Sequence, residues 1–160
     1  MTRSPSYSTL QIALHWIVAL LVGAAWLYAD GMGRLLNQKL EGTYSGGTPV
    51  HVLLGLAVLA FVVLRLVVRM SSGTPGAPEG TSDTHAAARH WGHVVLYVLL
   101  FAVPLGGVAA WYFGVRQVGE IHGLAANGLL ILAGVHAAIA IWHQWGRHDG
   151  TLMRMLKPGA

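Results

Sequence analysis

The chain has 160 residues, of which 54% are hydrophobic and only 10% are charged. A soluble domain usually carries about 25% charged residues, so this sequence has too few polar side chains to cover a soluble core. The same composition excludes a disordered chain. It favours a single membrane-embedded domain over residues 1–160, surrounded by lipid rather than by water.

The counts of two residue types and the net charge narrow the chemistry further. The sequence has nine histidines and no cysteine, which excludes thiolate metal sites and covalent haem attachment through a C-x-x-C-H motif. Any metal is therefore held by imidazole, carboxylate or neutral donors. The formal net charge of +4 does not indicate a nucleic-acid partner, because the basic residues do not cluster with interleaved aromatic residues.

Four apolar segments predict four membrane-spanning helices, at about residues 10–29, 50–70, 91–113 and 121–145. Apart from Arg65 and Arg69 in the second, these segments carry no charged side chain, and a helix needs about 20 residues to cross the hydrocarbon core. The first is longer than the apolar region of a signal peptide, and no A-x-A site follows it, so we expect it to be retained. Tryptophans lie toward the span ends, as interfacial belts do: Trp16, Trp26, Trp91, Trp111, Trp142 and Trp145.

The basic residues predict how the spans are oriented. Cytoplasmic segments of membrane proteins carry an excess of Lys and Arg. Both termini are therefore expected in the cytoplasm, together with a flexible second link over residues 69–90. A Gly-rich first link over 30–49 and a tight turn over 114–120 would face outward. Seven basic residues lie on the cytoplasmic side and three on the other: Arg3, Arg65, Arg69, Arg89, Arg147, Arg154 and Lys157 against Arg34, Lys39 and Arg116.

Six of the nine histidines lie inside the predicted spans, where ionisable residues are rare and usually functional. His136 follows His122 by 14 residues, which places it about 21 Å further along the helix and only about 40° around it. His51 begins the second span on the outer side, and His15 lies near the inner side of the first. The sequence therefore predicts an outer pair, His51 with His122, and an inner pair, His15 with His136.

Paired imidazoles on facing helices of a bundle are the ligands that a bis-histidine haem requires. Small residues next to the pairs, among them Gly55, Gly123 and Gly134, would let a flat ring approach the helices. Arg65 and Arg69 lie at the inner level and are candidate contacts for haem propionates. Arg65 has the alternative of simply extending to the cytoplasmic interface.

Two other site chemistries fit the pattern less well. Zinc or copper would need three or four ligands that converge, whereas these histidines fall at two depths. A proton-relay transporter would normally show Asp or Glu in its spans, and these spans have none.

The remaining histidines lie toward the cytoplasmic side. His93 and His143 are candidates for binding a quinone head group, or else ordinary interfacial residues. His90 is a further candidate for that site or an alternative inner ligand, and His85 and His148 are expected to be solvated.

Several motifs, taken in order, resemble those of the bacterial cytochrome b561 family over nearly the whole chain. They are LQIALHW around His15, VHVLLG around His51, VLRLVVR at Arg65 and Arg69, HWGHVVLY at residues 90–97, IHGLAAN around His122, GVHAAIAIWH at residues 134–143, and DGTLMRM in the tail. Each motif is short, but their order and the spacing of the spans make the resemblance specific.

The resemblance implies an all-α, multi-pass bundle of four helices in the bacterial inner membrane. It also implies two haems b per chain, with ligands His15, His51, His122 and His136. A further implication is electron exchange with ubiquinone at the cytoplasmic side, for which Arg69, His93 and His143 are the candidates.

The expected function is electron transfer across the membrane from an outer donor to ubiquinone. Some members of the family oxidise superoxide, so a superoxide:ubiquinone oxidoreductase is the leading hypothesis. The alternative is a haem-bearing anchor or electron-transfer subunit for a partner dehydrogenase or periplasmic redox protein. The outer links carry three basic and three acidic residues, so their net charge is zero and they show no surface that attracts anions.

Overall fold

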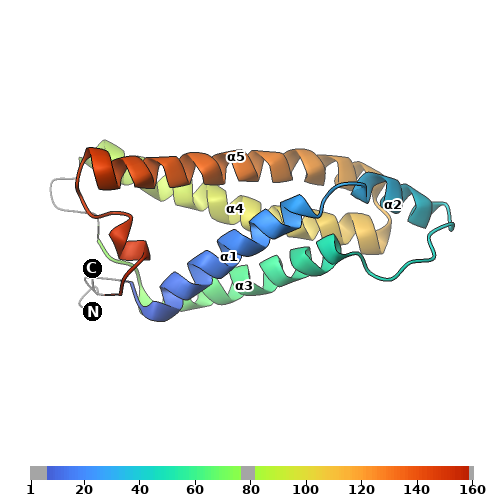
Figure 1. Cartoon of the computed structure of the whole chain (residues 1–160), viewed down its shortest axis with the longest axis horizontal. Coiled ribbons are helices and arrows are strands. Elements are labelled where there is room, and N and C mark those ends of the chain that lie inside the picture. Colours follow the sequence, from blue (N-terminus) through green and yellow to red (C-terminus); the bar gives the residue numbers. More distant parts are fainter. Residues whose placement is uncertain (1–6, 77–81, 159–160) are drawn as a thin grey trace.

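The computed structural model describes residues 7–76 and 82–158. Four helices in this part are long and apolar enough to cross a membrane: α1 (Thr9–Leu27), α3 (Val50–Ser72), α4 (Asp83–Phe113) and α5 (Arg116–Gly146). They run along the long axis of the molecule, and a short helix, α2 (Met32–Leu40), lies at one end (Figure 1). The predicted all-α membrane bundle is thereby confirmed. Arg3 and residues 77–81 of the second link, which belong to the topology prediction, lie outside the described residues.

The four long helices form two antiparallel pairs. The most extensive packing is between α1 and α3 and between α4 and α5, and the two pairs meet through α3 and α4. By contrast, α1 and α5 touch at few places, and the indole Nε1 of Trp26 donates a hydrogen bond of 3.1 Å across this side to Oδ1 of Asn127. The start of α1 and the end of α5 lie at the same end of the bundle (Figure 1).

The buried core occupies the middle of the bundle. It is formed by one or two residues from each long helix: Val18, Val58, Val62, Leu100, Val103 and Leu129. Leu129 lies seven residues from both His122 and His136 on α5, so this cluster separates the outer histidine level from the inner one. Many large apolar side chains are exposed on the outside of the helices, as expected for surfaces that face lipid rather than water.

The sequence predicts a Gly-rich loop for the first link, residues 30–49, but the structure contains a helix there, α2. Gly31 precedes this helix in the left-handed conformation, with φ of 75°, which glycine adopts without steric cost. Leu36 is buried in one cluster with Val52 and Trp111, while Arg34 and Lys39 are exposed. Tertiary packing of the apolar face stabilises so short a helix, and local sequence carries little signal for it.

The second and third links are shorter than the sequence predicts. The second link shrinks from 69–90 to residues 73–82, because α3 extends to Ser72 and α4 begins at Asp83. Asp83 interacts favourably with the helix dipole, and the alanines that follow are strong helix formers. The turn between α4 and α5 consists of Gly114 and Val115 alone. Apolar segments mark only the part of a helix that lies inside the membrane, about 30 Å thick. Helices α4 and α5, at 31 residues each, are about 46 Å long, so they extend beyond the apolar segments and shorten the links.

Gln11 joins the start of α1 to the end of α3. Its side-chain oxygen accepts from the Ser8 amide at 2.9 Å, while Ser8 Oγ accepts from the Gln11 amide at 3.2 Å, which completes a capping box. Gln11 Nε2 also donates to the carbonyl of Gly73 at 2.8 Å. This buried side chain therefore serves helix initiation and helix packing at once.

Replacement of Gln11 by Leu is expected to lower the free energy of unfolding by about 1–2 kcal/mol, because it removes half of the capping box and the bond to Gly73. Gln117→Leu is the matched control, since that side chain is exposed and a surface change should cost less than about 0.5 kcal/mol. Thermal unfolding in detergent, followed by tryptophan fluorescence, measures both variants. Equal melting temperatures would contradict the role given to Gln11.

Candidate functional site

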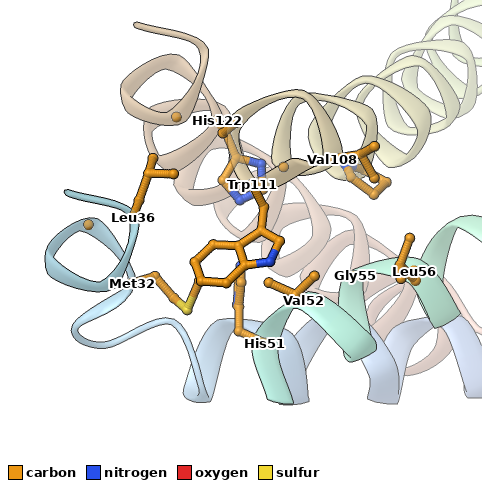
Figure 2. Close-up of a pocket in the computed structure, with 14 residues that line it drawn as sticks. Met32, Leu36, His51, Val52, Gly55, Leu56, Val108, Trp111 and His122 are labelled. Carbon is orange, nitrogen blue, oxygen red and sulfur yellow. The ribbon is translucent and has the colours of Figure 1, made fainter. Parts of the chain in front are cut away.

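The outer histidine pair lies between α3 and α5. The ring centroids of His51 and His122 are 5.9 Å apart, with the ring planes at 83°. Figure 2 shows the two imidazoles entering the same space from opposite sides, with Trp111 beside them. The structure therefore brings together the two residues that sequence position paired.

Hydrogen bonds fix the tautomer of both outer imidazoles. His51 Nδ1 lies 2.8 Å from the carbonyl oxygen of Ala25 on α1, and His122 Nδ1 lies 2.7 Å from that of Val103 on α4. A carbonyl oxygen can only accept, so both Nδ1 atoms carry the proton and donate it. The Nε2 lone pairs are then available to a metal, and such Nδ1 bonds are the usual way that ligating histidines are oriented.

A pocket opens between the two outer imidazoles. The space between its side chains, including its open side, measures about 570 Å³. Four glycines line it, Gly33, Gly55, Gly107 and Gly119. A Cβ added to Gly55 would meet no protein atom within 4 Å, whereas one added to Gly107 would lie 3.1 Å from Cε1 of His122. No neighbouring protein atom therefore requires a glycine at position 55. A flat ligand in the pocket would require one, because a side chain at this position would occupy its space.

Helix α2 closes the outer end of the pocket. Met32 and Leu36 line it together with Trp111 (Figure 2). The ammonium of Lys39 lies 4.4 Å from the centre of the Trp111 ring, within the range of a cation–π contact. The pocket is therefore covered by α2, which the sequence did not predict.

The inner histidines form a group of three rather than a pair. His15 and His136 have ring centroids 6.5 Å apart, as the sequence predicts for the inner pair. His93, predicted as a quinone-site residue, lies with its centroid 5.2 Å from that of His136, and its Nδ1 bonds the carbonyl of Arg89 at 2.7 Å. The ring of His90, the alternative inner ligand, is exposed and packs against Trp91.

Two arginines lie beside the inner histidines. Arg65 donates from Nη2 to Nδ1 of His15 at 2.9 Å, and the guanidinium carbons of Arg65 and Arg69 lie 5.2 and 5.7 Å from the centre of the Tyr97 ring. Within the described residues, neither arginine forms an ion pair with a carboxylate. These two half-buried cations are therefore available to an anionic ligand group.

His143, at the end of α5, is held by a residue that sequence reasoning missed. Its Nδ1 lies 2.5 Å from Oδ2 of Asp149, and Asp149 Oδ1 accepts from the Thr151 amide at 3.0 Å and from its hydroxyl at 2.6 Å. Burial would raise the pKa of Asp149, but the hydrogen bonds from His143 and Thr151 lower it to about 2. The Asp-Gly-Thr sequence after the helix, which is typical of an Asx turn, was the available signal.

Two histidines lie outside these groups. His85 is exposed and bonds the Ser82 hydroxyl at 2.6 Å, and His148 is exposed in the tail. Both therefore match the expectation of solvated residues.

The spacing of the paired imidazoles fits a haem iron. Two imidazole nitrogens at about 2 Å from one iron place the ring centroids about 6 Å apart, and the observed separations are 5.9 and 6.5 Å. Among the described residues, no group of three or more metal-binding side chains is arranged to hold a single metal ion, as zinc requires, and this includes the three inner histidines. The donor set and the glycine-lined pocket therefore suit a flat iron cofactor better than a bare metal ion.

An apolar helical bundle with histidines paired across its interior defines a membrane b-type cytochrome. A sequence profile of the prokaryotic cytochrome b561 family matches residues 6–158. The chain belongs to this family, and haem b is its cofactor. Together with the four apolar helices, the family indicates a multi-pass membrane protein of bacteria.

Curated relatives match the chain over nearly its whole length. It is 36% identical to cytochrome b562 of Cereibacter sphaeroides, with 99% of each chain covered. It is 29% identical to the probable superoxide oxidase CybB of Yersinia pestis, with 94% of this chain and 95% of the relative covered. It is 28% identical to cytochrome b561 homolog 2 of Escherichia coli, with 97% and 94% covered.

Replacement of Gly55 by Leu is expected to lower the haem bound per chain, because the new side chain enters the outer pocket from a position where a Cβ meets no protein atom within 4 Å. Gly128→Leu is the control, since a Cβ there also meets nothing within 4 Å and the residue lies outside the pocket. Haem absorbance per protein measures the effect, and circular dichroism checks the fold. A full haem complement in folded Gly55→Leu would show that haem does not occupy this pocket.

Proposed function

We propose that this protein carries two haems b and moves electrons across the bacterial inner membrane, between a donor on the outer side and ubiquinone on the cytoplasmic side. His51 and His122 would hold the outer haem, and His15 and His136 the inner one. The observation that carries this proposal is the presence of imidazole pairs at two levels of one bundle, each with the spacing that one iron requires. Haem b supplies one-electron chemistry, and the chain supplies position and surroundings.

Hydrogen bonds orient the outer pair for ligation. The bonds from His51 and His122 to carbonyls of neighbouring helices keep each Nε2 unprotonated and hold each ring in place. Gly55 leaves room for a flat ring. The buried side chains of Leu36 and Trp111 keep water from the outer end of the pocket.

For the inner haem, geometry favours His15 over His93 as the partner of His136. The His15 centroid separation of 6.5 Å lies nearer to the expected value of about 6 Å than the 5.2 Å of His93. Ligation through Nε2 of His15 requires a proton on Nδ1, so Arg65 must then donate elsewhere. A propionate carboxylate is a stronger acceptor for a guanidinium than an imidazole nitrogen, and Arg65 with Arg69 would take that role.

The cytoplasmic end supports reduction of ubiquinone there. His143 and Asp149 lie at the end of α5 opposite to α2, and Arg69 lies at the end of α3 on the same side. Six basic residues of the described chain lie toward this side, against three toward the other, which favours a cytoplasmic location for it and for both termini. The six are Arg65, Arg69, Arg89, Arg147, Arg154 and Lys157. Because Nδ1 of His143 donates to Asp149, the protonated ring can also donate from Nε2 to a quinone oxygen.

Superoxide is the proposed donor, supported by the similarity to a relative that is named a probable superoxide oxidase. One observation favours a second candidate function, that of an electron-transfer subunit for a partner dehydrogenase or periplasmic redox protein. The outer links have no net charge, so they would not steer a small anion toward the haem, whereas a protein donor would need no such field.

His51→Ala is expected to lose about half of the bound haem and to keep the rest, because only the outer axial pair is broken. His15→Ala should lose the other half. The haem that remains in His15→Ala should have a different reduction potential from the haem that remains in His51→Ala. His90→Ala is the control, since that exposed ring lies against Trp91 and should retain all haem. If His51→Ala lost both haems, or neither, the pairing would be wrong.

Stopped-flow mixing separates the two candidate functions. Oxidised protein mixed with superoxide should show rapid haem reduction, and reduced protein mixed with ubiquinone should show haem oxidation. Haem reduction by superoxide no faster than in a heat-denatured sample would exclude the superoxide reaction. Haem oxidation by ubiquinone in the same preparation would then favour the electron-transfer subunit.

A further inference from the structure

The cytoplasmic end of α5 carries an imidazole–carboxylate pair that the proposed electron path does not use. Asp149 Oδ2 lies 2.5 Å from His143 Nδ1, and this is the one ion pair between side chains of the described residues. The carboxylate is itself held by the Thr151 amide and hydroxyl, at 3.0 and 2.6 Å. A base oriented by a carboxylate that a further group fixes is an arrangement typical of proton transfer.

The charges and exposure of this pair suit repeated proton transfer. Asp149 is ionised at neutral pH, and its pKa is lowered further to about 2: burial opposes this shift, and the bonds from His143 and Thr151 outweigh it. The side chains of His143 and Asp149 are 22% and 23% exposed, so water from the cytoplasmic side reaches the pair while most of it stays enclosed. A carboxylate can only accept, so Nδ1 donates and Nε2 is the ring atom free to exchange a proton.

The tail that supplies Asp149 is docked independently of it. Arg154 Nη1 donates to the carbonyl of Gly76 at 3.2 Å, and the Met153 amide donates to Oε1 of Gln144 at 3.4 Å. The carboxylate is therefore delivered to His143 by a folded segment with its own anchors. Arg154 can consequently be changed to test the docking without touching the pair.

We propose that Asp149 is a positioning residue for His143, which it orients so that Nε2 delivers protons to a bound quinone. This inference rests on the proposed function, since it names the proton donor for the quinone reaction.

Reduction of a quinone to a quinol consumes two electrons and two protons. The electrons arrive singly from reduced haem b. For each proton, the Nε2–H bond of protonated His143 breaks as an O–H bond forms on a quinone oxygen, and the neutral ring then takes a new proton from cytoplasmic water. Asp149 stays ionised throughout and compensates the charge of the protonated ring, as the carboxylate of a catalytic triad does.

Oxidation of the dithionite-reduced protein by a short-chain ubiquinone tests the inference. Asp149→Asn keeps an oxygen that accepts from Nδ1 but loses the charge, so the limiting rate of haem oxidation should fall about 10- to 100-fold. The quinone concentration at half-maximal rate should change little. Asp149→Glu should restore much of the rate, and Thr151→Val should give an intermediate loss. Arg154→Gln, which weakens tail docking alone, should match the unaltered protein.

Proton NMR of the reduced protein, labelled with ¹⁵N at histidine, gives a readout independent of turnover. The His143 Nδ1–H signal should lie at low field, as expected for an N–H bonded to a carboxylate. It should move to higher field in Asp149→Asn and stay in place in Arg154→Gln. A signal that does not move in Asp149→Asn would overturn the pairing.

The outcomes separate this inference from the proposed function. If the unaltered protein is not oxidised by ubiquinone, the proposed quinone reaction fails and the role of Asp149 fails with it. If it is oxidised and Asp149→Asn reacts equally fast, only the role of Asp149 is overturned. An equal slowing in Arg154→Gln would also overturn it, because tail docking would then explain the effect.

Discussion

The arrangement depends on two hydrogen bonds between helices, from His51 to the carbonyl of Ala25 and from His122 to that of Val103. Lipid offers no partner to a polar group, so an imidazole inside a membrane bundle has to be satisfied by the protein. Each bond ties together one of the two helix pairs, α1 with α3 and α4 with α5. Each also leaves one ring nitrogen without a proton and without a protein partner, and an iron cofactor uses such a nitrogen.

The absence of water and of polar partners in lipid also explains other features of the interior. Gly55 leaves space that no protein atom fills, and Arg65 and Arg69 have no carboxylate partner among the described residues. In a soluble protein, water would fill the space and hydrate the charges. In a membrane, both features are costly unless a ligand completes them. A haem with two carboxylate side chains matches a flat space, a pair of imidazoles and nearby cations.

Much of this could be predicted from the sequence, because a membrane limits the choices. Helix periodicity and depth alone paired His51 with His122 and His15 with His136, and the structure brings both pairs together. Three features depend on tertiary contacts that no local pattern records. Leu36 stabilises α2 by packing against residues far away in the sequence, and His93 approaches His136 through the crossing of two helices. Asp149 reaches His143 because the tail folds back over the end of α5.

The central claim is that one chain of this size holds two haems at two depths of the membrane. The most direct test is the number of haems b per chain in the purified, fully reconstituted protein, measured from the pyridine haemochrome spectrum and the protein mass. We expect a ratio of about two, because each imidazole pair would bind one iron. A ratio of about one after full reconstitution would contradict it, since one of the two pairs would then serve another purpose.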